Sequence, residues 1–192
     1  LLESAVFPAG VMRVLLDACI LYPTVMREIL LGVAKAGLFT PLWSARILEE
    51  WARAVAKNLP DQDVVARGEI ALLRAGWPSS EFPQDQSLES QLHLPDPGDV
   101  HVLAAAITGK ADILVTANLS DFPTRILSSH NILRRDPDGF LIDLCQDDPA
   151  SVERVCEAVR IMAEAISGQQ QDMRALLKKA RLPRLGKALQ SR

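Results

Sequence analysis

Short apolar runs alternate along this chain with apolar residues at helical spacing. The first run, Val14-Leu15-Leu16, predicts a buried strand over residues 13–16 that ends at Asp17. Similar runs predict strands at 39–43, 113–116 and 132–134. Short strands separated by helices favour a parallel sheet that is covered by helices on both faces.

Helical spacing predicts most of the remaining chain to be helical. Thr24, Ser44 and several aspartates, among them Asp138 before the helix at 140–144, stand where helix N-caps are expected, and Gly37, Gly76 and Gly109 follow the last turns. The segment 79–94 is polar and predicts an irregular loop with one weak strand, and the residues after Pro183 are expected to be poorly ordered without a partner. The predicted helices cover residues 24–36, 44–57, 61–76, 96–107, 138–144, 150–166 and 169–181.

Two parts follow from this pattern: an α/β domain over residues 12–147 and a helical C-terminal extension over residues 148–192. The sequence does not begin with methionine, and Met12 lies just before the first strand. We therefore expect residues 1–11 to be an added or upstream segment, or disordered, and leave them out of the fold argument.

Composition places the chain among cytoplasmic globular proteins. With 192 residues and 48% hydrophobic residues it can bury a core of ordinary size. No apolar run approaches the roughly 20 residues of a membrane span, and no signal-peptide pattern is present. Three widely spaced cysteines without a CxxC pair indicate reduced thiols rather than a zinc site.

Charge is unevenly distributed along the chain. The net charge is −3, but the segment from Met173 onward carries seven Lys or Arg and no acid, which leaves about −10 on the rest. This basic tail could bind RNA phosphates. The preferred alternative is that its leucines form an amphipathic surface for a partner or a second copy. These leucines are Leu176, Leu177, Leu182, Leu185 and Leu189.

Acidic and amide side chains follow two of the predicted strands. Asp17 ends the first strand, and Asn118 and Asp121 lie in the loop after the strand at 113–116. Parallel strands place their carboxyl ends at one edge of the sheet, where ligands bind. Each of these residues could instead serve as an ordinary turn or cap residue. Thr116 could donate a hydrogen bond to Asp17 or be only a β-branched strand residue.

Further acids lie in two of the predicted helices. On a helical wheel Glu49 falls opposite the apolar arc, whereas Glu50 lies on its flank and could lean into a cleft, although a solvated face could explain both. Asp96 suits a helix cap, and Asp99 falls on the buried side of the next helix. His101 lies off that face and is predicted to be a surface or packing residue. Carboxylates at such positions suit a hard divalent cation, which predicts a metal-dependent phosphoryl-transfer site.

With these residues in place, the chain resembles a PIN domain, and more narrowly the toxins of VapC-type toxin–antitoxin pairs. The resemblance covers about residues 13–143, and four elements occur in the order found in the family. It is carried by the segments VLLDAC at 14–19, SARILEE at 44–50, DPGDVHVLAAA at 96–106 and VTANLSDFP at 115–123.

The resemblance implies a three-layer α/β/α fold with a small parallel sheet, Mg²⁺ or Mn²⁺, and endoribonuclease activity. Asp17, Glu50 and Asp99 match the three principal acids, and Asn118 and Asp121 stand at the fourth position. Asp17, Glu50, Asp99 and Asp121 would then be the metal ligands, with Thr116 and Ser44 in support, although Ser44 is first of all an N-cap. Cys19 departs from the family pattern, because many relatives carry Asn there.

The resemblance also implies partners, namely an RNA substrate, a protein antitoxin and a second copy in a homodimer, and no membrane. A competing hypothesis is a catalytically weak binding or interaction protein on the same scaffold, in which the acids are caps and solvated charges. A DNA-directed flap or repair nuclease ranks lower, since the chain lacks the long insertions expected for it.

Overall fold

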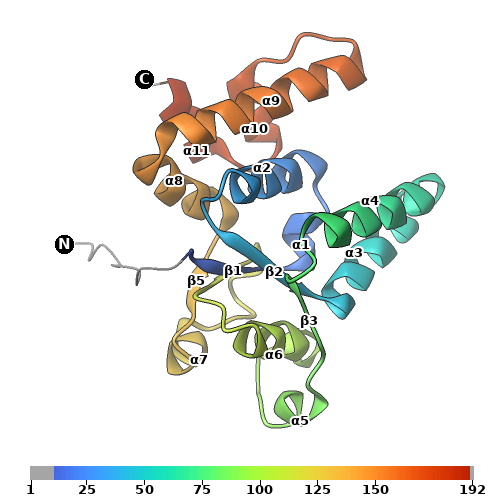
Figure 1. The fold of residues 1–192 in the computed structure, drawn as a ribbon, viewed down its shortest axis with the longest axis vertical. Helices are drawn as coiled ribbons and strands as arrows, with labels where there is room; N and C mark the ends of the chain where they lie inside the picture. The colour runs from blue at the N-terminus through green and yellow to red at the C-terminus, as the bar shows by residue number, and fades with distance from the viewer. Residues whose placement is uncertain (1–10, 191–192) are drawn as a thin grey trace.

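A single parallel sheet organises the protein. The computed structural model describes residues 11–190, so most of the expectation for residues 1–11 lies outside the described residues. Within this range the strands are β1 (Arg13–Leu16), β2 (Thr40–Ser44), β3 (Glu81–Phe82), β4 (Ile113–Val115) and β5 (Leu133–Arg135). They pair in parallel in the order β3-β2-β1-β4-β5 (Figure 1). The predicted α/β fold is confirmed.

Helices connect and follow the strands. Three short helices, at 18–21, 86–89 and 124–129, were not predicted, because a helix of one or two turns is too short to show a helical apolar period. Among residues 11–190, none of the helices combines the length and apolar character needed to cross a membrane. The helices are α1 (Ala18–Leu21), α2 (Thr24–Lys35), α3 (Ala45–Asn58), η1 (Pro60–Gln62), α4 (Asp63–Gly76), α5 (Gln86–Glu89), η2 (Pro97–Asp99), α6 (Val100–Thr108), α7 (Thr124–Ser129), α8 (Pro137–Asp147), α9 (Pro149–Ser167), α10 (Met173–Lys179) and α11 (Pro183–Gln190).

The helices form a layer on each face of the sheet. Figure 1 shows α2 and α8 on one side of the sheet and α6 and α7 on the other. Val14, Leu15 and Leu16 of the central strand β1 are fully buried, as expected for a strand covered on both faces. This is the three-layer α/β/α arrangement that the resemblance implied.

The strand order contains a reversal between β1 and β4. From β1 the chain moves outward through β2 to β3, then returns through α6 to β4 on the other side of β1. Such a reversal is a topological switch point, and ligands of open α/β sheets bind there, beyond the carboxyl ends of the strands. Asp17 follows β1 directly, and Thr116 follows β4, so both flank this point.

The C-terminal helices pack on the outer side of α2 and α8 (Figure 1). A Cβ atom at Gly32 of α2 would lie 2.5 Å from Cγ1 of Val155, so α9 approaches α2 too closely for any larger residue. Four of the five leucines of the basic tail are buried in the same body. The prediction that these leucines face a partner is therefore wrong, and the segment after Pro183 forms α11. The buried four are Leu176, Leu177, Leu182 and Leu185.

Asp138 has a different role from the predicted one. Asp136, not Asp138, caps α8, because its Oδ1 accepts a hydrogen bond from the Gly139 N–H at 2.9 Å. The buried Asp138 carboxylate instead accepts from the backbone N–H groups of Arg184 at 2.9 Å and Leu185 at 3.0 Å. Asp138 thus satisfies the first N–H groups of α11 from a helix 45 residues earlier in the chain, which sequence spacing could not reveal.

Replacing Asp138 with Ala leaves these two N–H groups without their acceptor and leaves the Arg184 guanidinium with Asp136 as its remaining carboxylate partner. We expect Asp138→Ala to lower the free energy of unfolding by about 2–3 kcal/mol, measured by urea denaturation. Trypsin should also cut faster after Lys178 and Arg181. Asp147→Ala, at the exposed end of the same helix, is the matched control and should change neither readout. Equal stability of the two variants would contradict this role for Asp138.

Candidate active site

Asp17 is a buried carboxylate at the end of the central strand. Its side chain is 5% exposed and makes no capping hydrogen bond to α1, so the cap alternative does not describe it. Oδ2 instead accepts a hydrogen bond from the Thr116 hydroxyl at 2.7 Å and one from the Cys19 thiol at 3.1 Å. The Thr116 hydroxyl therefore does hold Asp17, which joins the ends of β1 and β4 across the switch point.

Cys19 supplies the second hydrogen-bond donor to the Asp17 carboxylate. Its sulfur also accepts from the Ala117 N–H at 3.3 Å, and it lies 3.5 Å from the Thr116 hydroxyl. Burial, followed by the nearby Asp17 charge, raises the pKa of the Cys19 thiol to about 12. The thiol therefore stays protonated at neutral pH and remains a hydrogen-bond donor rather than a nucleophile.

Asp99 brings a second acid toward Asp17. It ends η2, directly before α6, and is half-buried. Burial raises its pKa, and the charges of Asp17, Asp96 and Asp121 raise it further, to about 6. Asp96 also accepts from the Gly98 N–H at 2.7 Å, which confirms its predicted capping role. The acids whose charges act on Asp99 lie at the end of β1 (Asp17), in the loop after β4 (Asp121) and in its own segment (Asp96), so three segments contribute negative charge here.

Glu50 lies beside the segment that carries Asp99. Its Oε1 accepts from Nε of Arg46 at 3.2 Å and lies 2.9 Å from Nε2 of His101, although the ring is poorly aligned for a hydrogen bond. Arg46 also reaches the carbonyl of Gly98 at 3.4 Å. Burial raises the pKa of Glu50, but the combined effects of His101 and Arg46 outweigh it and lower the pKa overall.

Glu49 and Ser44 lie outside this cluster. Glu49 pairs with Arg53 and Arg67, each at 3.2 Å, on the exposed side of α3, as the helical wheel predicted. Ser44 caps α3 by accepting from the Ile47 N–H at 3.2 Å. Ser44 is thus placed to fix the start of α3, and it reaches Glu50 only through that helix.

Asn118 and Asp121 differ in how they relate to the acids. Asn118 is exposed, and it is its backbone N–H that donates to the Thr116 hydroxyl, at 3.0 Å. The charge of Asp121, by contrast, contributes to the raised pKa of Asp99. Of the two residues at the fourth position, Asp121 is therefore the one whose carboxylate acts on the cluster.

A profile of the PIN domain matches residues 13–120 of this chain. The chain belongs to the PIN domain family. Over 45 residues it is 47% identical to the protein named "Putative ribonuclease VapC50" of Mycobacterium tuberculosis (strain ATCC 25618 / H37Rv). This match covers 23% of the present chain and 27% of the relative, so it spans about a quarter of either protein. No solved structure matches the chain.

Two further residues of this PIN domain lie beside the acids. His101 is buried, because α6 is enclosed from His101 to Ala106, so of the two predicted alternatives it is a packing residue and not a surface residue. Arg46 was not considered at all. Its position four residues before Glu50 is the signal that could have found it, since residues at i and i+4 share a helix face.

The donor set of this PIN domain suits a hard divalent cation. Carboxylate oxygens are the preferred ligands of Mg²⁺ and Mn²⁺, and a cation would offset the mutual repulsion that raises the pKa of Asp99. With the side chains as they stand, no three His, Cys, Asp or Glu residues within 11–190 are grouped closely enough to hold one ion. Their carboxylate oxygens are the ligand type that such an ion prefers. The side chains must move closer together before they can coordinate one ion jointly.

The hydrogen bond from Thr116 to Asp17 can be tested directly. Thr116→Val keeps the shape of the side chain but removes the donor, which leaves a buried carboxylate with one partner fewer. We expect a loss of about 1.5–3 kcal/mol in the free energy of unfolding, the range for hydrogen bonds to charged groups, measured by urea denaturation.

Thr40→Val in the neighbouring strand β2 is the control, because the Thr40 hydroxyl has no hydrogen bond among the described residues. Its unfolding free energy should change by less than about 0.5 kcal/mol. Equal effects of the two substitutions would show that the Thr116 hydroxyl contributes nothing to holding Asp17.

Proposed function

We propose that this PIN-domain protein is a metal-dependent endoribonuclease and the toxin of a toxin–antitoxin pair. The observation that carries the proposal is the convergence of Asp17, Asp99 and Asp121 at the switch point of the sheet, with Glu50 alongside. The name of the M. tuberculosis relative, which includes both ribonuclease and VapC, supports this reading. The catalytic domain would be residues 12–147, with residues 148–192 as an extension.

Asp17, Glu50, Asp99 and Asp121 would hold Mg²⁺ or Mn²⁺. When bound, such an ion lowers the pKa of a coordinated water and stabilises the charge that develops on a phosphodiester. The protein residues orient the site: Thr116 and Cys19 hold the Asp17 carboxylate, and Arg46 and His101 keep Glu50 ionised and in place. Asn118, exposed at the rim, is placed to contact the substrate.

The electrostatics favour phosphodiester cleavage by activated water. Converging carboxylates repel a polyanion unless a cation offsets their charge. An attack by the site's own thiol is disfavoured, because the Cys19 pKa of about 12 leaves almost no thiolate at neutral pH. The choice of RNA over DNA rests on the family and on the named relative.

We also propose a homodimer and a protein antitoxin, because of the PIN family and the VapC-named relative. The α4 helix supports an association surface, because it exposes several large aliphatic side chains that a monomer would leave in water. Cys19 and Cys156 are free thiols, which accords with a reducing, cytoplasmic setting. The exposed aliphatic residues of α4 are Val64 (80%), Val65 (57%) and Leu72 (74%).

The second candidate is a binding protein with little catalytic power. This candidate is favoured by the contacts of Glu50 with Arg46 and His101. These two side chains already offset the charge of one of the four acids, so Glu50 does not need a metal ion as its partner. On this hypothesis the protein has no saturable metal site.

The nuclease proposal predicts that Asp17→Asn abolishes RNA cleavage. Loss of one metal-binding charge should lower kcat/KM by about 100-fold or more, which corresponds to a few kcal/mol of transition-state stabilisation. The measurement is cleavage of labelled RNA with Mg²⁺ or Mn²⁺, with circular dichroism as the check on folding. Asp143→Asn, an exposed acid paired with Arg135, is the control and should keep full activity. Full activity of Asp17→Asn would end the proposal.

Metal binding distinguishes the nuclease from the binding protein. The neighbouring residues Glu50 and Glu49 of α3 provide the test variant and its control. We expect calorimetric titration of the wild type with Mn²⁺ to show a saturable site. Glu50→Gln should weaken this binding by at least about tenfold, since a charged ligand is lost. Glu49→Gln, which affects only exposed ion pairs, should leave it unchanged. A wild type without saturable Mn²⁺ binding would favour the binding-protein candidate.

A further inference from the structure

The outer face of α10 and α11 carries a basic hollow of about 390 Å³. Six residues line this basic hollow. Three of them are Lys or Arg, and all three are exposed, whereas the one acid caps α10 by accepting from the Ala175 N–H at 2.8 Å. The lining residues are Asp172, Arg174, Ala175, Lys178, Pro183 and Lys187.

The basic character of this face follows from how the two helices are anchored. Leu177, Leu182 and Leu185 are fully buried against the body of the protein, so the apolar side of the helical pair is already used. Gly186 allows the two helices to cross closely, because a Cβ there would lie 3.3 Å from Cβ of Leu177. The side of the helical pair that faces solvent therefore carries Arg174, Lys178 and Lys187. The structure thus favours a charged ligand over the apolar partner that the leucines suggested.

The start of α11, where Pro183 lines the hollow, is anchored at the edge of the sheet that carries the acids. All strands are parallel, so α8, which follows β5, starts at the same edge as Asp17. Asp136 and Asp138 at that start bind Arg184, the residue after Pro183 of the hollow. The Thr116 N–H donates to the carbonyl of Arg135 at 3.1 Å. Asp17 and the anchor of α11 are therefore two strand spacings apart, or roughly 10 Å.

Charge is also divided in a way that suits a long polyanion. The chain before Met173 carries about −10, whereas the segment after it carries seven positive charges and no acid. RNA that reaches the acids is repelled by most of this surface, and the basic α10–α11 face, whose start is anchored at the edge that carries Asp17, would compensate for this repulsion. The segment 173–190 contains no aromatic residue, so it can contact phosphates but cannot stack on bases.

We propose that the basic hollow binds the phosphate backbone of RNA beside the catalytic acids. This inference rests on the proposed nuclease function and names where the protein holds the flanking part of its substrate. Binding there is independent of base sequence and strongly dependent on salt.

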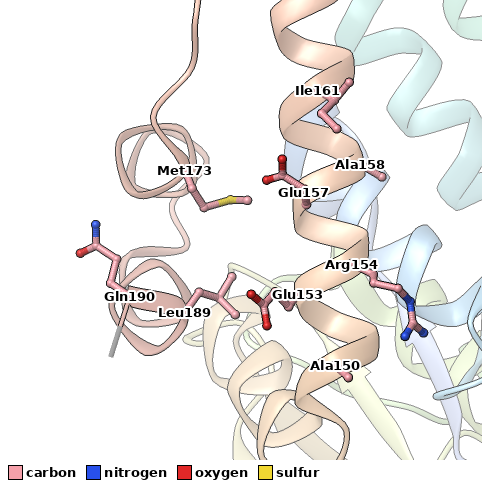
Figure 2. Close-up of a pocket in the computed structure, with 9 residues that line it drawn as sticks. All are labelled: Ala150, Glu153, Arg154, Glu157, Ala158, Ile161, Met173, Leu189 and Gln190. Atoms are coloured by element: carbon pink, nitrogen blue, oxygen red, sulfur yellow. The ribbon is translucent and has the colours of Figure 1, made fainter. Parts of the chain in front are cut away.

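A neighbouring groove limits where the RNA can run. Figure 2 shows this groove between α9 and the α10–α11 pair, with Glu153 and Glu157 facing Met173 and Leu189, while Arg154 points away. It has a volume of about 790 Å³, with Glu153 and Glu157 of α9 on one side and Met173 and Leu189 on the other. Phosphates are disfavoured beside these carboxylates, which leaves the basic hollow as the path along the C-terminal helices.

The test compares two triple variants of the full chain that lose the same charge. One is Arg174→Gln/Lys178→Gln/Lys187→Gln in the hollow. The other is Lys35→Gln/Lys57→Gln/Lys110→Gln, whose exposed residues end α2, lie in the last turn of α3 and precede β4, all outside the C-terminal helices. Binding of a fluorescein-labelled, mixed-sequence RNA 20-mer is measured by anisotropy from 50 to 300 mM KCl, in the Asp17→Asn background to prevent cleavage.

We expect the hollow variant to bind about 100-fold more weakly at 0.1 M salt, with the log–log salt slope smaller by about 2, since each phosphate contact of a single strand contributes about 0.7. The control variant should stay within about twofold of the parent. With Asp17 restored, the hollow variant should raise KM for RNA and keep kcat within about twofold, because the catalytic acids are untouched.

The remaining outcomes decide between the two proposals. Cleavage by the wild type combined with equal RNA binding by both triple variants would overturn the inference and leave the nuclease proposal intact. RNA binding through the hollow without any cleavage by the wild type would overturn the nuclease proposal and leave the inferred RNA-binding role of the hollow intact. Arg174→Lys/Lys178→Arg/Lys187→Arg keeps the charges and should restore binding, which separates a loss of charge from a loss of folding.

Discussion

The buried carboxylate of Asp17 is the constraint on which the rest of the structure depends. A carboxylate that is 5% exposed at the end of an apolar strand is costly unless hydrogen bonds satisfy it. Thr116 and Cys19 provide these bonds, and in doing so they join β1 to the end of β4. The strand reversal between β1 and β4 is therefore both the place where the sheet opens to a ligand and the place where its central acid is fixed.

The same edge of the sheet combines opposite charges. Asp17, Asp99 and Asp121 lie close enough for their charges to raise the pKa of Asp99 to about 6. Two strands away, Asp136 and Asp138 use their negative charge to anchor Arg184, and α10 and α11 then present Lys and Arg residues outward. A basic surface of this kind would complement the acidic centre of the proposed nuclease, because the phosphates that flank the cleaved one need positive partners.

Much of the fold could be predicted, and the failures have physical causes. The buried strand β1, the strand β4 and the capped helix α3 were predicted nearly at their observed bounds, since each has strong local periodicity and end signals. Asp138 was assigned to its own helix, whereas it serves α11, because a cap supplied from a distant part of the chain has no local pattern. The choice between a surface and a packing role for His101 stayed open in the sequence, because a helical wheel assumes one buried face and α6 is buried from His101 to Ala106.

The sequence by itself determined the order of the elements, the identity of the acids and the segregation of basic residues into the last twenty positions, since all of these are properties of local pattern and composition. Only the tertiary structure decided which acid acts on which, that Thr116 and Cys19 hold Asp17, and that the leucines of the tail point inward. These depend on contacts between residues about 100 positions apart, such as Asp17 with Thr116, and such contacts exist only once parallel strands have paired.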